Sequence, residues 1–236
     1  MGGVDMILAS KAIGTVAYLG GLPALLEQFC WSWGQMIQYN SEWVEPGRYV
    51  NYDRSAYTDH GPARNALANR FLGDWLVQLD TDHIFEPDLI ARLVNYADTL
   101  DIDVLSGVYQ MKNSPHLPVL YQWCGPDDAP GLQPMAMWDK RLKVVQIGSA
   151  GGGCLFVRRK VFDRIASELK QEPFDKLHPF SEDHSFFLRL KQLKIPAYAA
   201  LNIQCNHLRV MPVTFEDLPQ NGSLPTGEPF EVKGFE

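Results

Sequence analysis

The chain of 236 residues has few cysteines, and their number and spacing argue against both a zinc site and a disulfide-stapled scaffold. The four are Cys30, Cys124, Cys154 and Cys205, which lie far apart and form no C-x-x-C pair. This spacing is not that of a zinc site, and the cysteine density is too low for a disulfide-stapled scaffold. We therefore expect reduced thiols, as in a cytoplasmic protein.

A long apolar run and an excess of basic residues are also lacking. No run approaches the roughly 18 apolar residues of a membrane-spanning helix, and no basic and apolar leader opens the chain. We expect no membrane span and a cytoplasmic location. The formal net charge of -7 disfavours broad, nonspecific binding to nucleic acid. The remaining composition, 46% apolar and 21% charged, is that of an ordinary globular domain.

Strand-like and helix-like segments alternate through the first half of the chain. Strands are predicted at 15–19, 49–52, 75–79 and 104–109. Helices are predicted to begin at Gly61-Pro62 and at Pro87-Asp88, each followed by an apolar stripe at helical spacing. This alternation is typical of an α/β domain with a largely parallel sheet.

The second half of the chain has a different pattern. Strands are predicted at 119–123, 144–147, 154–157 and 197–200, helices at 160–170 and 183–193, and a loop at 125–134. This pattern predicts a smaller mixed or antiparallel extension of the sheet. We expect one domain over residues 1–208. Residues 209–236, rich in Pro and Gly, are predicted to be a lid, an interface segment or disordered.

Two carboxylates follow the apolar strand at 75–79. Asp80 and Asp82 are separated by one residue, and carboxyl ends of strands in open α/β sheets are where ligands bind. Buried carboxylates are costly unless they are paired or bound to metal, and a D-x-D step can hold a hard divalent cation. The alternative interpretation is an ordinary strand-to-turn junction, because Asp favours turns.

Three further segments carry polar or glycine residues at expected element ends. Arg64 and Asn65 lie near a helix start, which suits a phosphate, although a surface arginine is equally common there. Gly151, Gly152 and Gly153 precede a strand and permit a ligand to approach the backbone; a flexible turn is the alternative. The third segment has acidic residues opening a helix and a histidine after the final strand, namely Glu182, Asp183 and His207.

The order of these segments resembles that of nucleotide-sugar-dependent glycosyltransferases. The sequence has a first strand, then A-R-N, V-Q-L-D-T-D, G-G-G-C-L-F-V-R-R, S-E-D-H-S-F and a late histidine. The chain resembles the GT-A fold, in the family 2-like group found in bacteria and phages, from Thr15 to Leu208. The resemblance implies a mixed, mostly parallel central sheet flanked by helices, with a smaller antiparallel extension.

The resemblance also implies roles for individual residues. Asp82 is expected to bind Mn²⁺ or Mg²⁺ directly, with Asp80 on the metal or the ribose. His207 is expected to complete the metal site, and His83 is the alternative ligand. The residues expected to bind the nucleotide or donor are Tyr18, Arg64, Asn65, Asp80, Gly151, Gly152 and Gly153.

The expected reaction is sugar transfer from a UDP- or GDP-linked donor to a hydroxyl group. Asp183 is expected to be the base of an inverting mechanism, with Glu182 as the alternative base. Retaining relatives share the same fold and metal site. The acceptor is a glycan, a protein, a small molecule or a modified nucleic acid. Two other functions stay open, a nucleotidyltransferase acting on a sugar phosphate and a binding module without catalysis.

Overall fold

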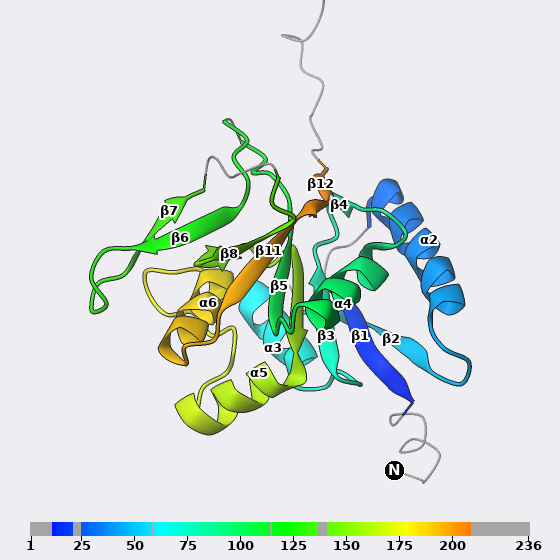
Figure 1. The fold of residues 1–236 in the computed structure, drawn as a ribbon, viewed down its shortest axis with the longest axis horizontal. Coiled ribbons are helices and arrows are strands. Elements are labelled where there is room, and N and C mark those ends of the chain that lie inside the picture. Colours follow the sequence, from blue (N-terminus) through cyan, green and yellow to red (C-terminus); the bar gives the residue numbers. More distant parts are fainter. Residues whose placement is uncertain (1–10, 21–24, 58, 114, 136–140, 209–236) are drawn as a thin grey trace, which may run out of the picture.

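The main sheet has seven strands in the order β2-β1-β3-β10-β5-β11-β8 (Figure 1). The structure, a computed structural model, describes residues 11–20, 25–57, 59–113, 115–135 and 141–208. The strands are β1 (Ala12–Leu19), β2 (Tyr49–Ser55), β3 (Trp75–Leu79), β5 (Val104–Val108), β8 (Val144–Ile147), β10 (Cys154–Arg158) and β11 (Ala197–Gln204). β10 runs antiparallel to both of its neighbours and β8 runs antiparallel to β11, whereas the other pairs are parallel. The expected mixed, mostly parallel sheet is confirmed.

Two small antiparallel sheets accompany the main one. One has the order β7-β6-β9, from β6 (Leu120–Cys124), β7 (Gly131–Pro134) and β9 (Ser149–Ala150), and it is the expected extension. The other pairs β4 (His83–Ile84) with β12 (Asn206–His207). In Figure 1, β4 and β12 lie together beyond the ends of β3 and β11. This second pairing brings a late segment of the chain to the D-x-D step.

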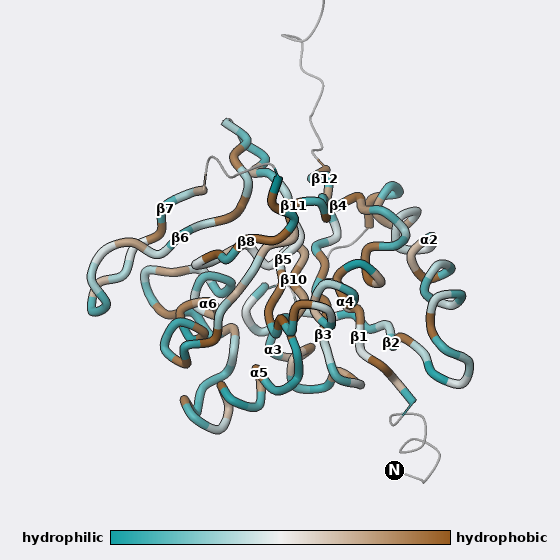
Figure 2. Tube along the Cα trace, in the orientation of Figure 1, coloured by the Kyte–Doolittle hydropathy of each residue, from teal (hydrophilic) through white to brown (hydrophobic). Residues whose placement is uncertain are grey.

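Helices cover both faces of the main sheet. One hydrophobic layer joins the sheet to α3 (His60–Ala68), α5 (Arg159–Arg164) and α6 (Glu182–Gln192). The other layer joins it to α2 (Glu27–Trp43) and α4 (Leu89–Thr99). Because both faces are covered, β3, β5 and most of β10 are buried along their length. Figure 2 shows the hydrophobic residues concentrated in the middle of this sheet.

Several element bounds differ from the sequence prediction. The expected loop at 125–134 contains β7, which pairs with β6. The last strand extends to Gln204, because Cys205 N–H still donates to Val108 O across an irregular register. The expected helix at 160–170 is α5 followed by a π-helical turn, Ile165–Leu169, which ends at Lys170 in a left-handed conformation (φ 58°). Such turns and short strands have no apolar periodicity of their own.

Two further expectations concern the thiols and the membrane. All four cysteines are free, with Cys154 and Cys205 buried and Cys30 and Cys124 exposed. None of the helices in the described ranges is both long enough and apolar enough to cross a membrane. The predicted tail at 209–236 lies outside the described residues.

Candidate active site

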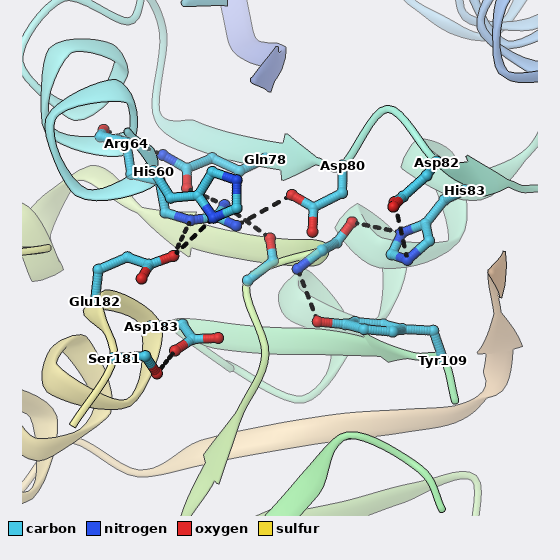
Figure 3. Close-up of polar contacts among 12 residues, drawn as sticks. His60, Arg64, Gln78, Asp80, Asp82, His83, Tyr109, Ser181, Glu182 and Asp183 are labelled. Atoms are coloured by element: carbon cyan, nitrogen blue, oxygen red, sulfur yellow. Dashed lines mark hydrogen bonds and ion pairs between the residues drawn. The ribbon is translucent and has the colours of Figure 1, made fainter. Parts of the chain in front are cut away.

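The D-x-D carboxylates lie at the carboxyl edge of β3. Asp80 directly follows the buried strand, and its backbone N–H donates to Gly153 O over 3.0 Å. Its side chain is 27% exposed and that of Asp82 is 30% exposed. Figure 3 shows Asp80 turned toward Arg64 and Asp82 lying beside His83. The two carboxylates thus have different partners.

Asp82 belongs to a cluster with two histidines. One ligand atom from each of Asp82, His83 and His207 can be chosen so that all three lie within 4.8 Å of one another. His207 Nε2 is 3.4 Å from Asp82 Oδ2, and His83 Nε2 is 4.0 Å from Asp82 Oδ1. His207 reaches this position because β12 pairs with β4 and Leu208 N–H donates to Asp82 O. The structure therefore brings together both histidines considered from the sequence.

Both imidazoles are oriented by backbone carbonyls. His83 Nδ1 lies 3.0 Å from Gly153 O, and His207 Nδ1 lies 2.8 Å from Gln110 O. A carbonyl only accepts, so in each neutral ring Nδ1 carries the proton and Nε2 keeps its lone pair. Metal-ligating histidines are held in this way. Burial lowers the pKa of His83, which keeps the ring neutral, and its buried Nε2 has no hydrogen-bond partner among the described residues. These residues fit a divalent cation with mixed oxygen and nitrogen ligands.

A lysine also contacts Asp82. Lys112 Nζ hydrogen-bonds to Asp82 Oδ2, and the Lys112 side chain is 43% exposed. Burial acts to raise the pKa of Asp82, but the hydrogen bond from Lys112 and the positive charge nearby outweigh it, so the net shift is downward. Asp82 is therefore ionised at neutral pH, as a metal ligand must be.

Arg64, on α3, is buried beneath the site. It donates to Gln78 Oε1 (3.1 Å), Gly152 O (2.9 Å) and Asp80 Oδ1 (3.1 Å), and it is only 2% exposed. Its Nε lies 3.7 Å from Glu182 Oε1, beyond hydrogen-bond distance. Burial acts to lower the pKa of Arg64, but the neighbouring carboxylates raise it overall. The guanidinium of this arginine, which was predicted to bind phosphate, is thus hydrogen-bonded to acceptors of the protein itself.

Each of the three glycines faces a large side chain of the site. A Cβ on Gly151 would lie 2.0 Å from Tyr109 Oη, and one on Gly152 would lie 2.4 Å from Arg64 Cζ. A Cβ on Gly153 would lie 2.3 Å from His83 Cε1. Contacts this short are sterically forbidden. The sequence suggested that a ligand approaches the backbone of these glycines. In the structure, side chains of the protein itself lie against this backbone.

Tyr109 supports the same turn. Its hydroxyl accepts a hydrogen bond from Gly153 N–H over 3.1 Å, and its ring lies 4.5 Å from that of His83 between centroids. Burial raises the pKa of Tyr109 well above its usual value, so the phenol stays neutral. Tyr109 therefore holds Gly153 from one side while His83 holds it from the other.

The two acidic residues that open α6 have different surroundings. Glu182 has a largely buried side chain, 3.6 Å from His60 Nδ1 and 3.7 Å from Arg64 Nε. Burial acts to raise its pKa, but the ion pair with His60 and the charge of Arg64 lower it to about 2. Figure 3 shows Glu182 turned toward these two partners and Asp183 lying on the other side of the helix start.

Asp183 is held through one of its carboxylate oxygens. Oδ1 accepts from Ser181 Oγ and from the backbone N–H of His184, the latter over 2.7 Å. No described residue donates a hydrogen bond to Oδ2. The Asp183 side chain is half-buried, and its charge acts on Arg64, Tyr109 and Tyr121. One oxygen thus fixes the carboxylate and the other is available.

Two predicted nucleotide-binding residues lie apart from this group. Asn65 donates to Asp175 Oδ1 and accepts from Phe174 N–H, both over 2.8 Å, so its amide is used in holding the segment before α6. Tyr18 lies near the end of β1, where its ring packs edge-on against Phe29 and Trp33 of α2. It shares the carboxyl edge of the sheet with Asp80, because Tyr18 pairs with Leu79.

The sequence did not point to four residues of the site, namely His60, Gln78, Tyr109 and Lys112. Gln78 is the polar residue inside the apolar run of β3, and this is a signal that could have been read, because a buried amide requires a partner. Lys112 and His60 carry no such signal, since exposed lysines and histidines are common anywhere in a chain.

A comparison with protein families identifies the family of this chain. The family model described as glycosyl transferase family 2 matches residues 41–166. This match covers more than half of the chain and includes the D-x-D step and the glycine turn. The chain belongs to glycosyl transferase family 2. It therefore carries a glycosyl transferase family 2 domain, and its sheet is that of the GT-A fold.

A solved structure supports the fold of this family 2 domain. The chain is similar to the crystal structure of GalNAc-T7 with UDP, GalNAc and Mn²⁺, with a TM-score of 0.54 and 13% sequence identity. The alignment covers 90% of this chain and 46% of that chain, so the present chain spans under half of the longer protein. At this identity the likeness is one of fold. No curated protein matches the sequence.

Proposed function

We propose that the chain is a metal-dependent glycosyltransferase that uses a nucleoside-diphosphate sugar and transfers with inversion. The observation that carries the proposal is the cluster of Asp82, His83 and His207, in which both imidazoles present Nε2 toward one carboxylate. Oxygen and imidazole ligands together favour Mn²⁺ over Mg²⁺. GalNAc-T7, which has a similar fold, was crystallised with UDP and Mn²⁺, and this makes UDP the first nucleotide to test.

The metal ligands in this proposal are Asp82, His83 and His207. A bound divalent cation would offset the charge that builds on the leaving diphosphate. Asp80 takes a different role, because Arg64 donates a hydrogen bond to one of its oxygens over 3.1 Å. We assign Asp80 to the donor ribose or to the edge of the metal site. Tyr18, on the same sheet edge, is assigned to the nucleoside.

Asp183 is the better candidate for the base. A general base must accept a proton near neutral pH, and Glu182, with a pKa of about 2, is a weak acceptor. Asp183 has one oxygen fixed by Ser181 and His184 and the other without a donor among the described residues. We assign its free oxygen to the proton of the attacking hydroxyl group. Arg64, Glu182, Asn65 and the three glycines then position the groups that react.

Binding to a panel of nucleoside diphosphates, each with and without Mn²⁺, tests the proposal. The melting temperature of the protein should rise with one nucleotide only when Mn²⁺ is present, and Asp82→Asn should abolish the rise. Asp127→Asn is the control, because Asp127 is 94% exposed on the extension. Slow hydrolysis of the matching sugar donor should accompany binding. If no nucleotide shifts the melting temperature with any metal, the donor and metal assignments fail and a glycan-binding module becomes the better explanation.

A further inference from the structure

Lys112 reaches the candidate metal site from a short arm that follows β5. The arm comprises residues 109–119, and the described part of it is closed by several backbone hydrogen bonds. Met111 N–H donates to Leu117 O and Val119 N–H donates to Tyr109 O, both over 2.9 Å. The backbone that carries Lys112 is therefore held in place, while its side chain is partly exposed.

The ammonium of Lys112 and a divalent cation would use the same oxygen. Lys112 Nζ contacts Asp82 Oδ2, and this is also the carboxylate oxygen that lies 3.4 Å from His207 Nε2. Two cations on one carboxylate oxygen repel each other strongly. A cation held by Asp82 and His207 therefore requires Lys112 to leave, and the long flexible stem of lysine allows this without a change of backbone.

A cationic side chain beside the metal would further stabilise the leaving diphosphate, and the other basic residue of the site has its donors engaged elsewhere. Among the described residues, two basic side chains pair with the D-x-D carboxylates: Arg64 with Asp80 and Lys112 with Asp82. Arg64 is buried and donates to Gln78, Gly152 and Asp80. Lys112, in contrast, gives up its carboxylate partner when that carboxylate binds a cation.

The space for such a movement lies next to Lys112. A cavity of about 330 Å³ is lined by the arm and by the ends of β11 and β12, including Tyr109, Lys112, Gln204 and His207. It carries no carboxylate among its lining residues. The released ammonium thus has room on the side of the site that borders His207, without a second carboxylate to hold it.

We propose that Lys112 exchanges partners, from the Asp82 carboxylate to the diphosphate of the donor, and so selects diphosphates over monophosphates. This inference rests on the proposed function. It assigns to one lysine two opposite effects, competition with the metal and attraction of the nucleotide. A lysine that merely stabilised the fold would weaken both kinds of binding when it was replaced.

The test is a pair of titrations on Lys112→Met, which removes the charge and keeps most of the stem. The first titration uses Mn²⁺ alone, and electron paramagnetic resonance measures the free ion at each step. The variant should bind Mn²⁺ several-fold more tightly than the wild type. The second titrates nucleoside diphosphate at saturating Mn²⁺ by calorimetry, and the variant should bind about 10- to 100-fold more weakly, the range for a charged hydrogen bond. Affinity for the nucleoside monophosphate should change much less.

Two comparison variants complete the design. Lys112→Arg keeps the charge and should retain most of the diphosphate affinity. Lys191→Met removes a lysine that also pairs with a carboxylate, Asp127, but lines a different cavity, and it should leave both titrations unchanged. Mn²⁺ affinity that is unchanged or weaker in Lys112→Met, or equal losses for mono- and diphosphate, would overturn the inference while the proposed function stands. A wild-type protein that binds neither Mn²⁺ nor any nucleotide would overturn the proposed function itself.

Discussion

His83 donates from Nδ1 to the carbonyl oxygen of Gly153 over 3.0 Å, and this bond fixes which nitrogen of the buried ring faces Asp82. The same oxygen belongs to the residue whose N–H is held by the Tyr109 hydroxyl. The glycine turn and the histidine therefore position each other. The consequence is that His83 Nε2 is available to a ligand without any rearrangement of the ring.

The first prediction concerns the two histidines. His83→Gln and His207→Gln should each weaken Mn²⁺ binding by about 10- to 100-fold or more, because each removes an imidazole nitrogen from the cluster. Titration of Mn²⁺ followed by electron paramagnetic resonance measures the affinity. His116→Gln is the matched control, since His116 is exposed and bonds to Met111 O on the arm. Wild-type affinity in His83→Gln would remove His83 from the metal site and leave His207 as its only histidine.

The second prediction separates the two acidic residues of α6. Asp183→Asn should reduce sugar transfer by roughly 100-fold or more, because the base is lost, and should leave nucleotide affinity close to that of the wild type. Transfer is measured by release of the nucleoside diphosphate in the presence of acceptor. Asp127→Asn, on the exposed end of the extension, should have no effect. If Asp183→Asn transfers at the wild-type rate, Asp183 is not the base.

The third prediction concerns the stability of the Glu182 ion pairs. Because the pKa of Glu182 is lowered from 4.5 to about 2, its contribution is fully present above pH 4.5 and is lost as the pH falls toward 2. The shift corresponds to about 3 kcal/mol at most. Glu182→Gln should therefore lower the free energy of unfolding at pH 7, and the difference from wild type should shrink as the pH falls below 4.5. Urea unfolding at several pH values measures both.

A surface ion pair serves as the control for this pH dependence. Glu168 pairs with Arg164 one helical turn away, and both side chains are more than 40% exposed. Since solvent screens such a pair, Glu168→Gln should change the free energy of unfolding far less than Glu182→Gln. A constant difference between wild type and Glu182→Gln from pH 7 to pH 3 would contradict the assigned ionisation.

The fourth prediction concerns the middle glycine of the turn. A Cβ on Gly152 would lie 2.4 Å from Arg64 Cζ, so Gly152→Ala should displace the guanidinium from Asp80 and lower the free energy of unfolding by roughly 1–3 kcal/mol. Nucleotide affinity should fall with it. Gly34→Ala is the control, because a Cβ there meets no atom within 4 Å and α2 should become slightly more stable. Unchanged stability in Gly152→Ala would show that Arg64 has room to move.

The fifth prediction concerns Asn65, which the sequence assigned to the nucleotide. Its amide bonds to Phe174 and Asp175, so Asn65→Ala should lower the free energy of unfolding by about 1–3 kcal/mol. Nucleotide affinity, measured by calorimetry well below the melting temperature, should stay near the wild-type value. A large loss of nucleotide affinity with unchanged stability would assign Asn65 to nucleotide binding.

The sequence placed Asp80 and Asp82 at the end of a buried strand, and the resemblance to glycosyltransferases added His207 to them. The structure brings the three residues together, because the ends of β3 and β11 come to one edge of the sheet. The four longer strands of the first half and the helices α3 and α4 were predicted because each carries its own apolar pattern.

Contacts between distant segments could not be predicted in this way. Whether Arg64 is exposed or buried depends on Gly152, which lies far along the chain and leaves room for the guanidinium. Lys112 lies on an irregular arm, where no periodicity indicates the direction of a side chain. The strand β7 was missed because Gly, Pro and Asp hide it among turn residues.

The antiparallel direction of β10 has a consequence for engineering this enzyme. The turn at Gly151–Gly153 joins two strands that are already paired, β9 on the extension and β10 between β3 and β5. An inserted residue there cannot simply bulge outward. If it shifted β10 by one position, Leu155 and Phe156 would each turn to the face of the sheet opposite to the one they now occupy. Changes of donor or acceptor preference are therefore better sought in the arm at 109–119, where the described residues Asn113 and His116 are exposed and belong to no strand of the main sheet.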